Sequence, residues 1–339
     1  MIPQSEIELN ALLAQPLAAD IEAMSRLDGP LVVLGAGGKM GPTLAARAAL
    51  AMREAGSRHK VIAVSRFTEP AGREWLDSLG VQTVSADLLA PGALEDLPDA
   101  PNVVFMAARK FGSSGSPWLT WTTNALLPGL AARRYRSSRI VAFSTGNVYS
   151  FTPVDSGGPV ESSPVAPVGE YAWSALARER IFEQAALEGA KVALVRLNYA
   201  CDLRYGVLHD LAQKILEGSP VDLAMGHVNL IWQGDANSAA LRLLEHAASP
   251  ALPVNVTSPV TYSVRALALE LGQRLGRPPV FAGQESTSAL LSNAGLMTRL
   301  LGAPPTPLEW MLDATAQWLL AGGRSLGKPT RFQVRDGVF

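Results

Sequence analysis

The sequence contains a single cysteine, Cys201, and little charge of either sign. One cysteine excludes an internal disulfide framework and is typical of a reducing compartment. Lys and Arg number 29 and Asp and Glu 30, so the net charge is −1. Nucleic-acid binding is therefore disfavoured, because it needs a basic excess to neutralise phosphates. Apolar residues make up 48% of the chain, which excludes disorder over most of its length.

Long uncharged apolar runs are also missing. The longest apolar stretch, around 31–52, is broken by Lys39, Arg47 and several glycines. A membrane span needs about 20 mostly apolar residues without such charges. The N-terminus has Glu6 and Glu8 where a signal peptide would be apolar. We therefore expect a cytoplasmic protein without membrane association.

Motifs for metal, hydrolase and nucleoside triphosphate chemistry are absent. The four histidines are scattered, and no pair has the spacing of a zinc site. The segment 143–146 is no Gly-x-Ser-x-Gly nucleophile elbow, and the glycine-rich segment 35–41 lacks a Gly-Lys-Ser/Thr ending. No metal is therefore expected.

Short apolar runs alternate with helical patterns over most of the chain. Uninterrupted apolar runs predict strands buried on both faces, and the helices between them indicate a parallel sheet. We expect an α/β fold, a doubly wound parallel sheet with a smaller C-terminal α/β lobe. The strands are predicted at 31–37, 61–66, 81–88, 102–108, 139–145, 191–200, 229–233 and 254–258. The helices are predicted at 42–56, 70–79, 120–136, 170–188, 235–246 and 263–275.

Composition changes divide the 339 residues, a length that allows two domains. A stretch rich in Pro, Gly and Ser over 151–170 interrupts the alternation. The predicted parts are an N-terminal helical arm at 1–28, a dinucleotide-binding domain at 29–200, a mainly substrate-binding lobe at 201–322 interleaved with that domain, and an irregular tail at 323–339.

The strongest local motif is a glycine-rich turn between the first predicted strand and the first helix after it. Such a turn needs residues that tolerate positive φ and a backbone bare enough to approach a pyrophosphate. The helix that follows presents free N–H groups to the phosphates. We expect a nicotinamide dinucleotide here, with an ordinary strand-to-helix turn as the alternative. The expected cofactor ligands in the turn are Gly35, Gly37, Gly38, Lys39, Met40 and Gly41.

The end of the second strand distinguishes the two nicotinamide dinucleotides. An acidic residue there binds the ribose 2′-hydroxyl of NAD, whereas an Arg accommodates the 2′-phosphate of NADP. This strand ends Val64-Ser65-Arg66, with no acid. We expect Ser65 and Arg66 to contact the cofactor, with help from Lys39. NADP is therefore preferred over NAD, and the alternative is that Arg66 is a solvated residue at a helix start.

With these residues in view, the chain resembles the extended short-chain dehydrogenase/reductase family, in its NAD-dependent epimerase/dehydratase branch, from about Gly29 to Leu320. The resemblance implies a Rossmann dinucleotide-binding fold. It also implies a catalytic Tyr that acts as acid or base, a Ser or Thr that bonds the substrate oxygen, and hydride transfer with the nicotinamide. The residues that carry the resemblance are Gly35, Gly38 and Gly41; Asp87 and Leu88; Ala107 and Ala108; Asn124; the segment 143–149 with Thr145; Tyr171; and the stretch 196–205 with Asn198.

The sequence departs from the family at one central position. The family has a Lys four residues after its catalytic Tyr, but here Ala175 follows Tyr171. Positions four apart share a helix face, so no neighbour on that turn replaces the Lys, and Arg178 is expected to face elsewhere. Lys110 follows the fourth strand where ligands of such sheets bind, so it is a candidate replacement, with a surface lysine as the alternative.

The predicted substrate lobe departs as well. Family members that act on nucleotide sugars carry an Arg before the Asp that matches Asp235, and the stretch 226–235 has none. We therefore expect a small polyhydroxylated or carbonyl substrate, a sugar derivative or sugar acid rather than a nucleotide sugar. The expected substrate-binding residues are Thr145, Asn147, Arg204, Tyr205 and Trp232.

Three functions remain open from the sequence. The first is an NAD(P)-dependent oxidoreductase or epimerase. The second is a cofactor-binding sensor or scaffold without turnover, which Ala175 favours. The third is a non-redox lyase or isomerase that retains its dinucleotide. The resemblance also implies a homodimer formed through the helices at 120–136 and 170–188.

Overall fold

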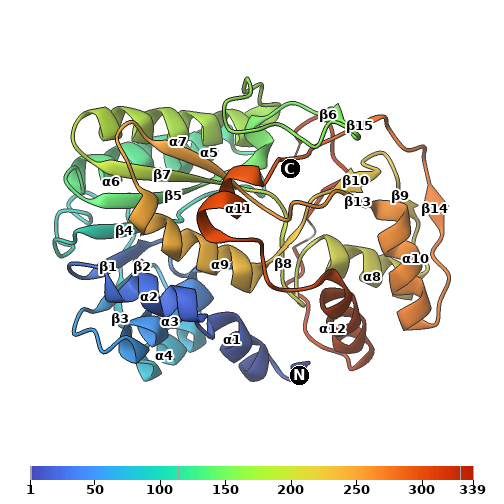
Figure 1. Cartoon of the computed structure of the whole chain (residues 1–339), viewed down its shortest axis with the longest axis horizontal. Coiled ribbons are helices and arrows are strands. Elements are labelled where there is room, and N and C mark those ends of the chain that lie inside the picture. The colour runs from blue at the N-terminus through green and yellow to red at the C-terminus, as the bar shows by residue number, and fades with distance from the viewer. Residues whose placement is uncertain (1, 114, 329, 339) are drawn as a thin grey trace.

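A seven-stranded parallel sheet forms the centre of the molecule (Figure 1). The computed structural model describes residues 2–113, 115–328 and 330–338. The strand order is β12-β7-β5-β4-β1-β2-β3, which confirms the predicted doubly wound parallel sheet. Its strands are β1 (Leu31–Leu34), β2 (Val61–Ser65), β3 (Gln82–Ser85), β4 (Asn102–Phe105), β5 (Arg139–Thr145), β7 (Lys191–Leu197) and β12 (Leu252–Val256).

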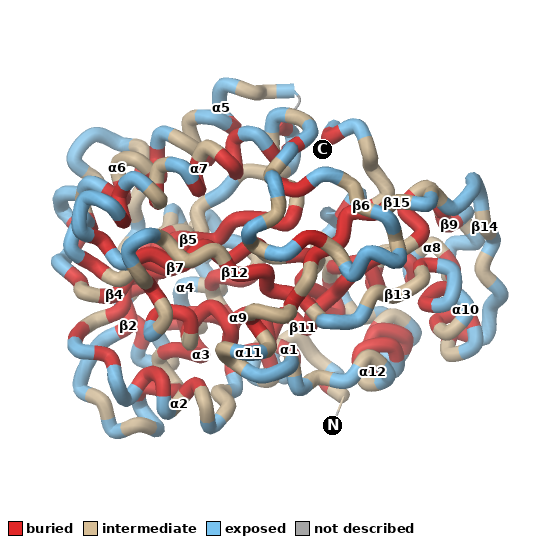
Figure 2. The backbone as a smooth tube through the Cα atoms, turned by 45° about the horizontal axis from the view of Figure 1, so that its top comes forward, coloured by how far each residue is buried: buried red, intermediate tan, exposed pale blue. Residues whose placement is uncertain are grey.

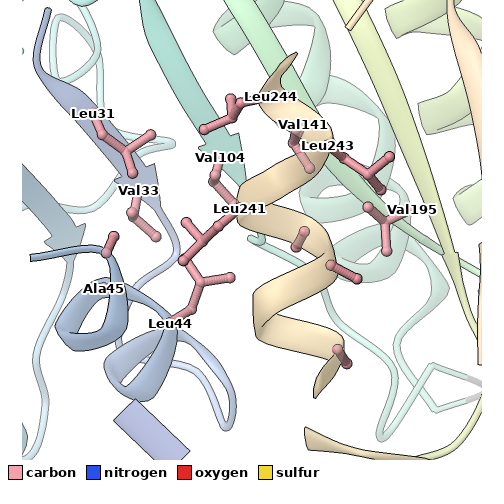
Figure 3. Close-up of a cluster of buried hydrophobic side chains, with 14 of the residues drawn as sticks. Leu31, Val33, Leu44, Ala45, Val104, Val141, Val195, Leu241, Leu243 and Leu244 are labelled. Carbon is pink, nitrogen blue, oxygen red and sulfur yellow. The ribbon is translucent and has the colours of Figure 1, made fainter. Parts of the chain in front are cut away.

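The apolar runs form this sheet because both of its faces are covered. Successive side chains of a strand point to opposite faces, so Val32 and Val33 enter different cores. The core on one face joins residues of β1, β4, β5 and β7 to helices α3 (Gly41–Glu54) and α9 (Gln233–Arg242), as Figure 3 shows. Figure 2 shows buried backbone through the strands and exposed segments on the outer helices. Strands buried on both faces explain why no polar alternation is visible in their sequence.

Helices cover the two faces in two groups. One face carries α3, α9, α2 (Ala18–Ser25), α4 (Pro70–Ser78) and α11 (Gly295–Leu301). The other face carries α6 (Leu127–Arg134) and α7 (Gly169–Leu187). The chain enters α6 through α5 (Pro117–Trp121) and the π-helical turn η1 (Thr122–Leu126). The helix predicted at 120–136 thus begins earlier, at Pro117, and changes its hydrogen bonding ahead of Pro128, which has no amide hydrogen.

The C-terminal lobe has a separate hydrophobic core beside the sheet. Helices α8 (Val207–Glu217), α10 (Val264–Leu275) and α12 (Leu308–Leu320) build it. Its short strands are β6 (Thr152–Pro153), β8 (Ala200–Cys201), β9 (Val221–Asp222), β10 (His227–Val228), β11 (Ile231–Trp232), β13 (Tyr262–Ser263), β14 (Phe281–Ala282) and β15 (Ser288–Ala289). The remaining short helices are η2 (Gly146–Val148) and η3 (Leu243–His246).

One strand within the range predicted for the lobe, 201–322, joins the central sheet instead. The segment predicted at 254–258 is β12, which pairs in parallel with β7 from Leu252 to Val256. The physical reason is that Val254, Asn255 and Val256 are all buried, which covers an edge that β7 would otherwise expose.

The N-terminal segment ties the lobe to the sheet. It holds two helices, α1 (Glu6–Ala14) and α2, separated by Pro16. Apolar residues of α1 pack in the lobe core, whereas α2 packs against the sheet core. The carboxylate of Asp20 is buried and accepts a hydrogen bond from Arg47 Nε at 2.7 Å and another from the Ser238 hydroxyl. A buried carboxylate paired in this way fixes the position of the segment.

In the described part of the chain, no helix combines the length and the hydrophobicity that crossing a membrane requires.

Candidate active site

The carboxyl ends of the central strands meet along one edge of the sheet, where the chain reverses its winding direction. From β1 the chain continues to β2 on one side and later returns to β4 on the other. Ligands of open parallel sheets bind at such a point. The residues expected to form the site follow these strands: Gly35 after β1, Arg66 after β2, Asp87 after β3, Ala107 after β4, Thr145 at the end of β5 and Asn198 after β7.

The glycine-rich turn lies in this position, and its outer glycines are required by close packing. Gly35 has φ +90°, and a Cβ there would lie 2.6 Å from the amide nitrogen of Ala107. A Cβ on Gly41 would lie 2.5 Å from the carbonyl oxygen of Ala36. Both contacts are with backbone, which has no freedom to move aside. The turn is therefore held tightly against the end of β4.

The two middle glycines face different surroundings. A Cβ on Gly37 would overlap the Ser65 hydroxyl at the end of β2, whereas one on Gly38 would meet only Gly35 O at an ordinary 3.5 Å. Helix α3 begins directly after Met40, so its free N–H groups end at the turn. A bare backbone followed by a helix N-terminus fits the pyrophosphate of a dinucleotide.

The end of the sheet beyond β2 suits the adenosine half of such a cofactor. The Arg66 side chain is exposed and Ser65 is half-buried, so both are accessible to a ligand. Asp87 is exposed, and its Oδ1 accepts a hydrogen bond from the Leu89 amide at 3.1 Å. Its neighbour Leu88 is buried under the sheet. These side chains could hold the adenosine ribose and base.

Asn124 has all its hydrogen bonds within the protein. It lies in η1, fully buried, and its Nδ2 donates to Arg109 O at 2.8 Å and to Ser174 Oγ at 3.0 Å. Its Oδ1 accepts from the Arg109 amide at 2.8 Å. It therefore fixes the loop that carries Ala107 and Ala108, instead of presenting a free amide to a cofactor.

A cavity of about 120 Å³ lies next to the glycine turn. It brings together the three expected catalytic residues from α7, the end of β5 and the loop after β4. The lining residues are Lys39, Met40, Lys110, Ser144, Thr145, Asn147, Tyr171, Leu197, Asn198, Tyr199, Ala200, Tyr205, Gly206, Val207 and Thr330.

Thr145 and Tyr171 both line this cavity. The Thr145 hydroxyl donates to Asn147 Oδ1 at 3.0 Å and accepts from the Asn147 amide at 3.2 Å. Burial raises the pKa of the Tyr171 phenol, while the positive charge of Arg178 and the Thr145 hydrogen bond lower it. A substrate hydroxyl or carbonyl next to this pair would meet both a proton donor or acceptor and an orienting hydroxyl.

The expectation that Arg178 faces elsewhere is wrong. Its side chain is only 2% exposed, and Nη1 donates to Phe143 O at 2.7 Å. Ala175 lies three residues earlier on the same buried face of α7. Its small side chain leaves room on this face for the larger side chain of Arg178. Nε and Nη2 of Arg178 have no hydrogen-bond partner among the described residues. A buried guanidinium thus acts on Tyr171 in a helix that lacks the family's lysine.

Lys110 lies at the cavity as expected. Its Nζ is 5.8 Å from the centroid of the Tyr171 ring and donates to Thr330 O at 3.2 Å. Burial lowers the pKa of Lys110 to about 8, and the charge of Lys39 contributes to the shift. The C-terminal segment thus contacts a titratable ammonium that lies near the Tyr171 ring.

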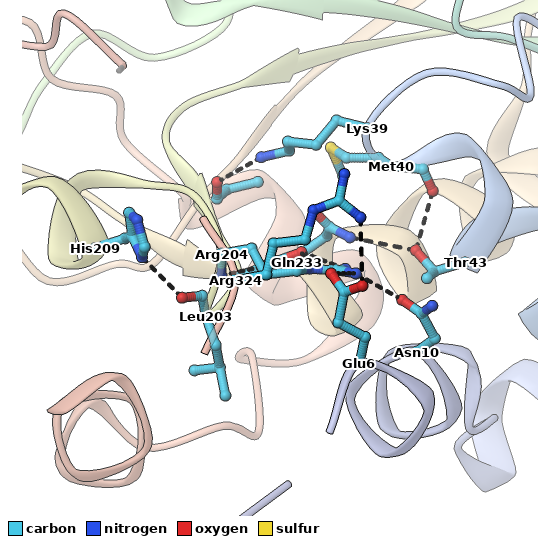
Figure 4. A network of polar contacts seen from close by, with 12 residues as sticks. Glu6, Asn10, Lys39, Met40, Thr43, Leu203, Arg204, His209, Gln233 and Arg324 are labelled. Carbon is cyan, nitrogen blue, oxygen red and sulfur yellow. Dashed lines mark hydrogen bonds and ion pairs between the residues drawn. The ribbon is translucent and has the colours of Figure 1, made fainter. Parts of the chain in front are cut away.

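Lys39 points away from Arg66 and into the same cavity. Its Nζ donates to Ala200 O at 3.2 Å, a contact that Figure 4 draws, and lies 3.7 Å from the centroid of the Tyr205 ring. Burial lowers the pKa of Lys39 to about 8. In this position it does not assist Arg66 with a 2′-phosphate.

Two expected substrate residues lie outside the cavity. The Arg204 guanidinium binds Asp202 Oδ2 at 2.8 Å and Asn10 Oδ1 at 3.0 Å, among the polar contacts in Figure 4. Trp232 is buried in the lobe core, with its ring 5.1 Å from that of Trp310 in a T-shaped arrangement. Both residues stabilise the lobe. Tyr205, Asn147 and Asn198 do line the cavity.

Two contacts with the predicted tail were missed by the sequence reasoning. Thr330 lies in the predicted tail, but it is buried and its amide and hydroxyl donate to Asp210 Oδ2 at 2.7 and 2.6 Å. The Tyr199 hydroxyl donates to Phe332 O at 3.4 Å. No local pattern in this polar segment indicates a role, because these two contacts are with residues more than one hundred positions away. Within the described residues, no cluster of His, Cys, Asp or Glu could hold a metal ion.

Comparisons with known proteins agree with this geometry. No curated protein sequence matches the chain. Among solved structures, MoeE5 in complex with UDP-glucose and NAD is similar with a TM-score of 0.69 at 19% identity, over 87% of this chain and 99% of its own. A UDP-glucuronic acid 4-epimerase from Bacillus cereus in complex with NAD has a TM-score of 0.69 at 17% identity, over 86% and 96%.

A UDP-glucose 4-epimerase from Thermotoga maritima, crystallised with UDP-glucose, has a TM-score of 0.71 at 18% identity, over 86% and 99% of the two chains. At these identities the likeness shows the fold alone. The family is shown by sequence, because the model of the NAD dependent epimerase/dehydratase family matches residues 31–256. A glycine turn at the switch point of the sheet, a Thr–Tyr pair beside it and this match lead to one conclusion: the chain is an enzyme of the NAD-dependent epimerase/dehydratase family.

Proposed function

We propose that the protein is an NAD(P)-dependent oxidoreductase or epimerase that acts on a small polyhydroxylated or carbonyl substrate. The observation that carries the proposal is that Thr145 and Tyr171 line one cavity next to the glycine turn. Bound at that turn, a nicotinamide dinucleotide supplies hydride transfer. The turn and α3 would hold its pyrophosphate, and Tyr171 and Thr145 would handle the substrate oxygen.

Tyr171 acts as the acid or base in this proposal. A phenol has a pKa near 10, so it needs positive charge nearby to exchange protons near neutral pH. Arg178 supplies such a charge from within α7, and it lowers the Tyr171 pKa against the effect of burial. Lys110 is the second candidate, since its ammonium is 5.8 Å from the Tyr171 ring centroid. Together they would replace the lysine that is Ala175 here.

NADP is the cofactor we propose as preferred. The exposed Arg66 at the end of β2 and the absence of an acid there support it. Two of the similar structures contain NAD, so the alternative preference is NAD.

The substrate we propose is a sugar derivative or sugar acid rather than a nucleotide sugar. The stretch 226–235 contains no Arg, and the cavity of about 120 Å³ is small. Thr330 forms part of its wall. The similar structures named above were crystallised with UDP-glucose or belong to a UDP-sugar epimerase, which favours the opposite choice. Binding of UDP-glucose at micromolar concentration would decide against our proposal.

A sensor or scaffold without turnover is the second candidate, favoured by Ala175. A non-redox lyase or isomerase that retains its dinucleotide is the third. Two measurements on the purified protein test all three candidates. One is titration with NADPH and NADH, followed by nicotinamide fluorescence, and the other is an assay of hydride exchange. Binding with Tyr171-dependent hydride exchange supports the enzyme, and binding without exchange supports the sensor. Retained cofactor with turnover but no net redox change supports the lyase, and no binding of either cofactor overturns the proposal.

A homodimer is also proposed. Apolar side chains are exposed on α5, η1 and α7, the helices expected to form the dimer: Trp118, Leu119, Trp121, Leu126, Trp173 and Leu187. Sedimentation that shows only monomer at micromolar concentration would contradict this. The cytoplasmic location stays a prediction.

A further inference from the structure

The active-site cavity contains more positive charge than its proposed acid–base chemistry requires. Two lysines line it, and no Asp or Glu is among the described residues of its lining. Lys110 lies next to Tyr171, as the proposed mechanism uses it. Lys39 comes from the glycine turn, and neither the Thr–Tyr pair nor the 2′-phosphate site uses it.

The surroundings of Lys39 hold its ammonium in place without neutralising it. It donates to Ala200 O, a neutral acceptor, and lies over the face of the Tyr205 ring. A cation is attracted to such a face, which fixes its position. Lys39 is thus positioned at the cavity by a carbonyl and a ring.

The carboxylates nearest to Lys39 are engaged elsewhere. Asp202 accepts from the Arg204 guanidinium at 2.8 Å, and from the Arg204 amide. Asp210 accepts from the amide and hydroxyl of Thr330 at 2.7 and 2.6 Å. Their charges act on Lys39 only from a distance, and burial still lowers its pKa to about 8. A partly buried cation such as Lys39, held by neutral groups, is stabilised by an anion that enters its cavity.

The size of the cavity limits that anion. About 120 Å³ is well below the ~300–1,000 Å³ of typical ligand pockets. The C-terminal segment closes one side, because Thr330 O bonds Lys110 and Phe332 is buried in the lobe core. A single carboxylate or phosphate group on a short carbon chain fits this space.

We propose that Lys39 binds the anionic group, a carboxylate or a phosphate, of a small hydroxy or keto substrate whose reacting oxygen lies at Tyr171 and Thr145. The inference rests on the proposed function and narrows its substrate to an acid. Lys110 supplies the second positive charge and stays with Tyr171, so the two lysines have separate roles.

The test is anion binding by the full chain in saturating NADP⁺, followed by thermal stabilisation at constant ionic strength. The probes are glucuronate and glycolate as carboxylates, inorganic phosphate, and glucose as the neutral comparison. We expect saturable stabilisation by an anion and none by glucose, and the stronger anion identifies the group. In Lys39→Met the affinity falls about tenfold or more, since a hydrogen bond to a charged group is lost. Lys39→Arg restores most of it.

Lys60→Met is the matched control. Lys60 is exposed and precedes β2, at the edge of the sheet opposite the cavity, so anion binding remains at the wild-type level. Equal effects of anions and glucose, or anion binding that survives Lys39→Met, would overturn the inference. So would a loss of NADP⁺ affinity in Lys39→Met as large as the loss of anion affinity, because Lys39 would then be a cofactor ligand.

The two proposals fail in different ways. If neither dinucleotide binds, the proposed function fails, and the same anion titration without cofactor still tests Lys39. If the dinucleotide binds and exchanges hydride but no anion binds, only the present inference fails.

Discussion

The glycine turn and the catalytic cavity lie side by side, but the sequence builds them in different ways. The turn is one run of seven residues, Gly35–Gly41, whose requirements come from backbone packing within that run and against the ends of β2 and β4. The cavity takes its charged and aromatic side chains from separate segments: Lys39, Lys110, Tyr171, Tyr199 and Tyr205.

The two regions also obtain their positive charge differently. At the turn it comes from the N-terminus of α3, which any sequence that folds this way provides. In the cavity it comes from individual side chains, which can change position without a change of fold. The comparison teaches that a family can keep its cofactor turn without a lysine at position 175, and in our proposal Arg178 and Lys110 supply that charge.

The largest effect on turnover should come from Tyr171, the proposed acid or base. Tyr171→Phe removes the acid or base, so turnover should fall about 10²–10⁴-fold while NADPH affinity is retained. Turnover and fluorescence titration on the same protein measure this. Tyr262→Phe in the lobe is the control and should retain full activity. Turnover retained in Tyr171→Phe would remove the catalytic role of the cavity altogether.

Substitution in the turn should act on stability and cofactor binding together. Gly35→Ala places a Cβ against the Ala107 backbone at positive φ, so unfolding free energy should drop by about 1–3 kcal/mol and cofactor binding should be lost. Gly38→Ala is the matched control, because its Cβ meets only an ordinary contact at 3.5 Å. Denaturant unfolding compares the two. Equal loss of stability would show that packing does not distinguish these glycines.

The positive charge that acts on Tyr171 should affect the pH dependence of turnover. Removing the Arg178 guanidinium raises the pKa of the phenol, because a positive charge stabilises the phenolate. The pH at which base-catalysed turnover reaches half its maximum should therefore rise in Arg178→Met and return in Arg178→Lys. An unchanged profile in Arg178→Met together with a shifted one in Lys110→Met would assign the role to Lys110 alone.

The smallest effect should be at the exposed end of the cofactor site. Arg66→Ala should weaken NADPH binding about tenfold and leave NADH binding unchanged, since only NADPH carries the 2′-phosphate. Fluorescence titration with both cofactors measures this. A preference for NADH in the wild-type protein would contradict the role of Arg66. It would leave the role of the glycine turn in cofactor binding unchanged.

Much of the fold could be predicted because its signals are local. The uninterrupted apolar run at 139–145 is β5 with the same bounds, and the helix predicted at 170–188 is α7, one residue earlier at each end. The range predicted for the lobe includes β12, which belongs to the central sheet, since only tertiary pairing shows which sheet an isolated short strand joins.

Side-chain direction was harder to predict than position. The sequence places Arg204 close to the site, yet Asp202 and Asn10 hold it in the lobe. It places Arg178 seven residues after Tyr171, and burial turns that side chain inward. An ion pair or a buried contact with a distant segment decides such directions, and neither appears in a local pattern.

The sequence by itself determined the parallel sheet, the glycine turn and the absence of a lysine at position 175, because apolar runs, glycines and residue identity are local properties. Only the tertiary structure decided which charges surround Tyr171 and which group Lys39 faces. Coulomb interactions depend on distance in space, and folding brings residues 39, 110, 178 and 330 into one region although the chain separates them.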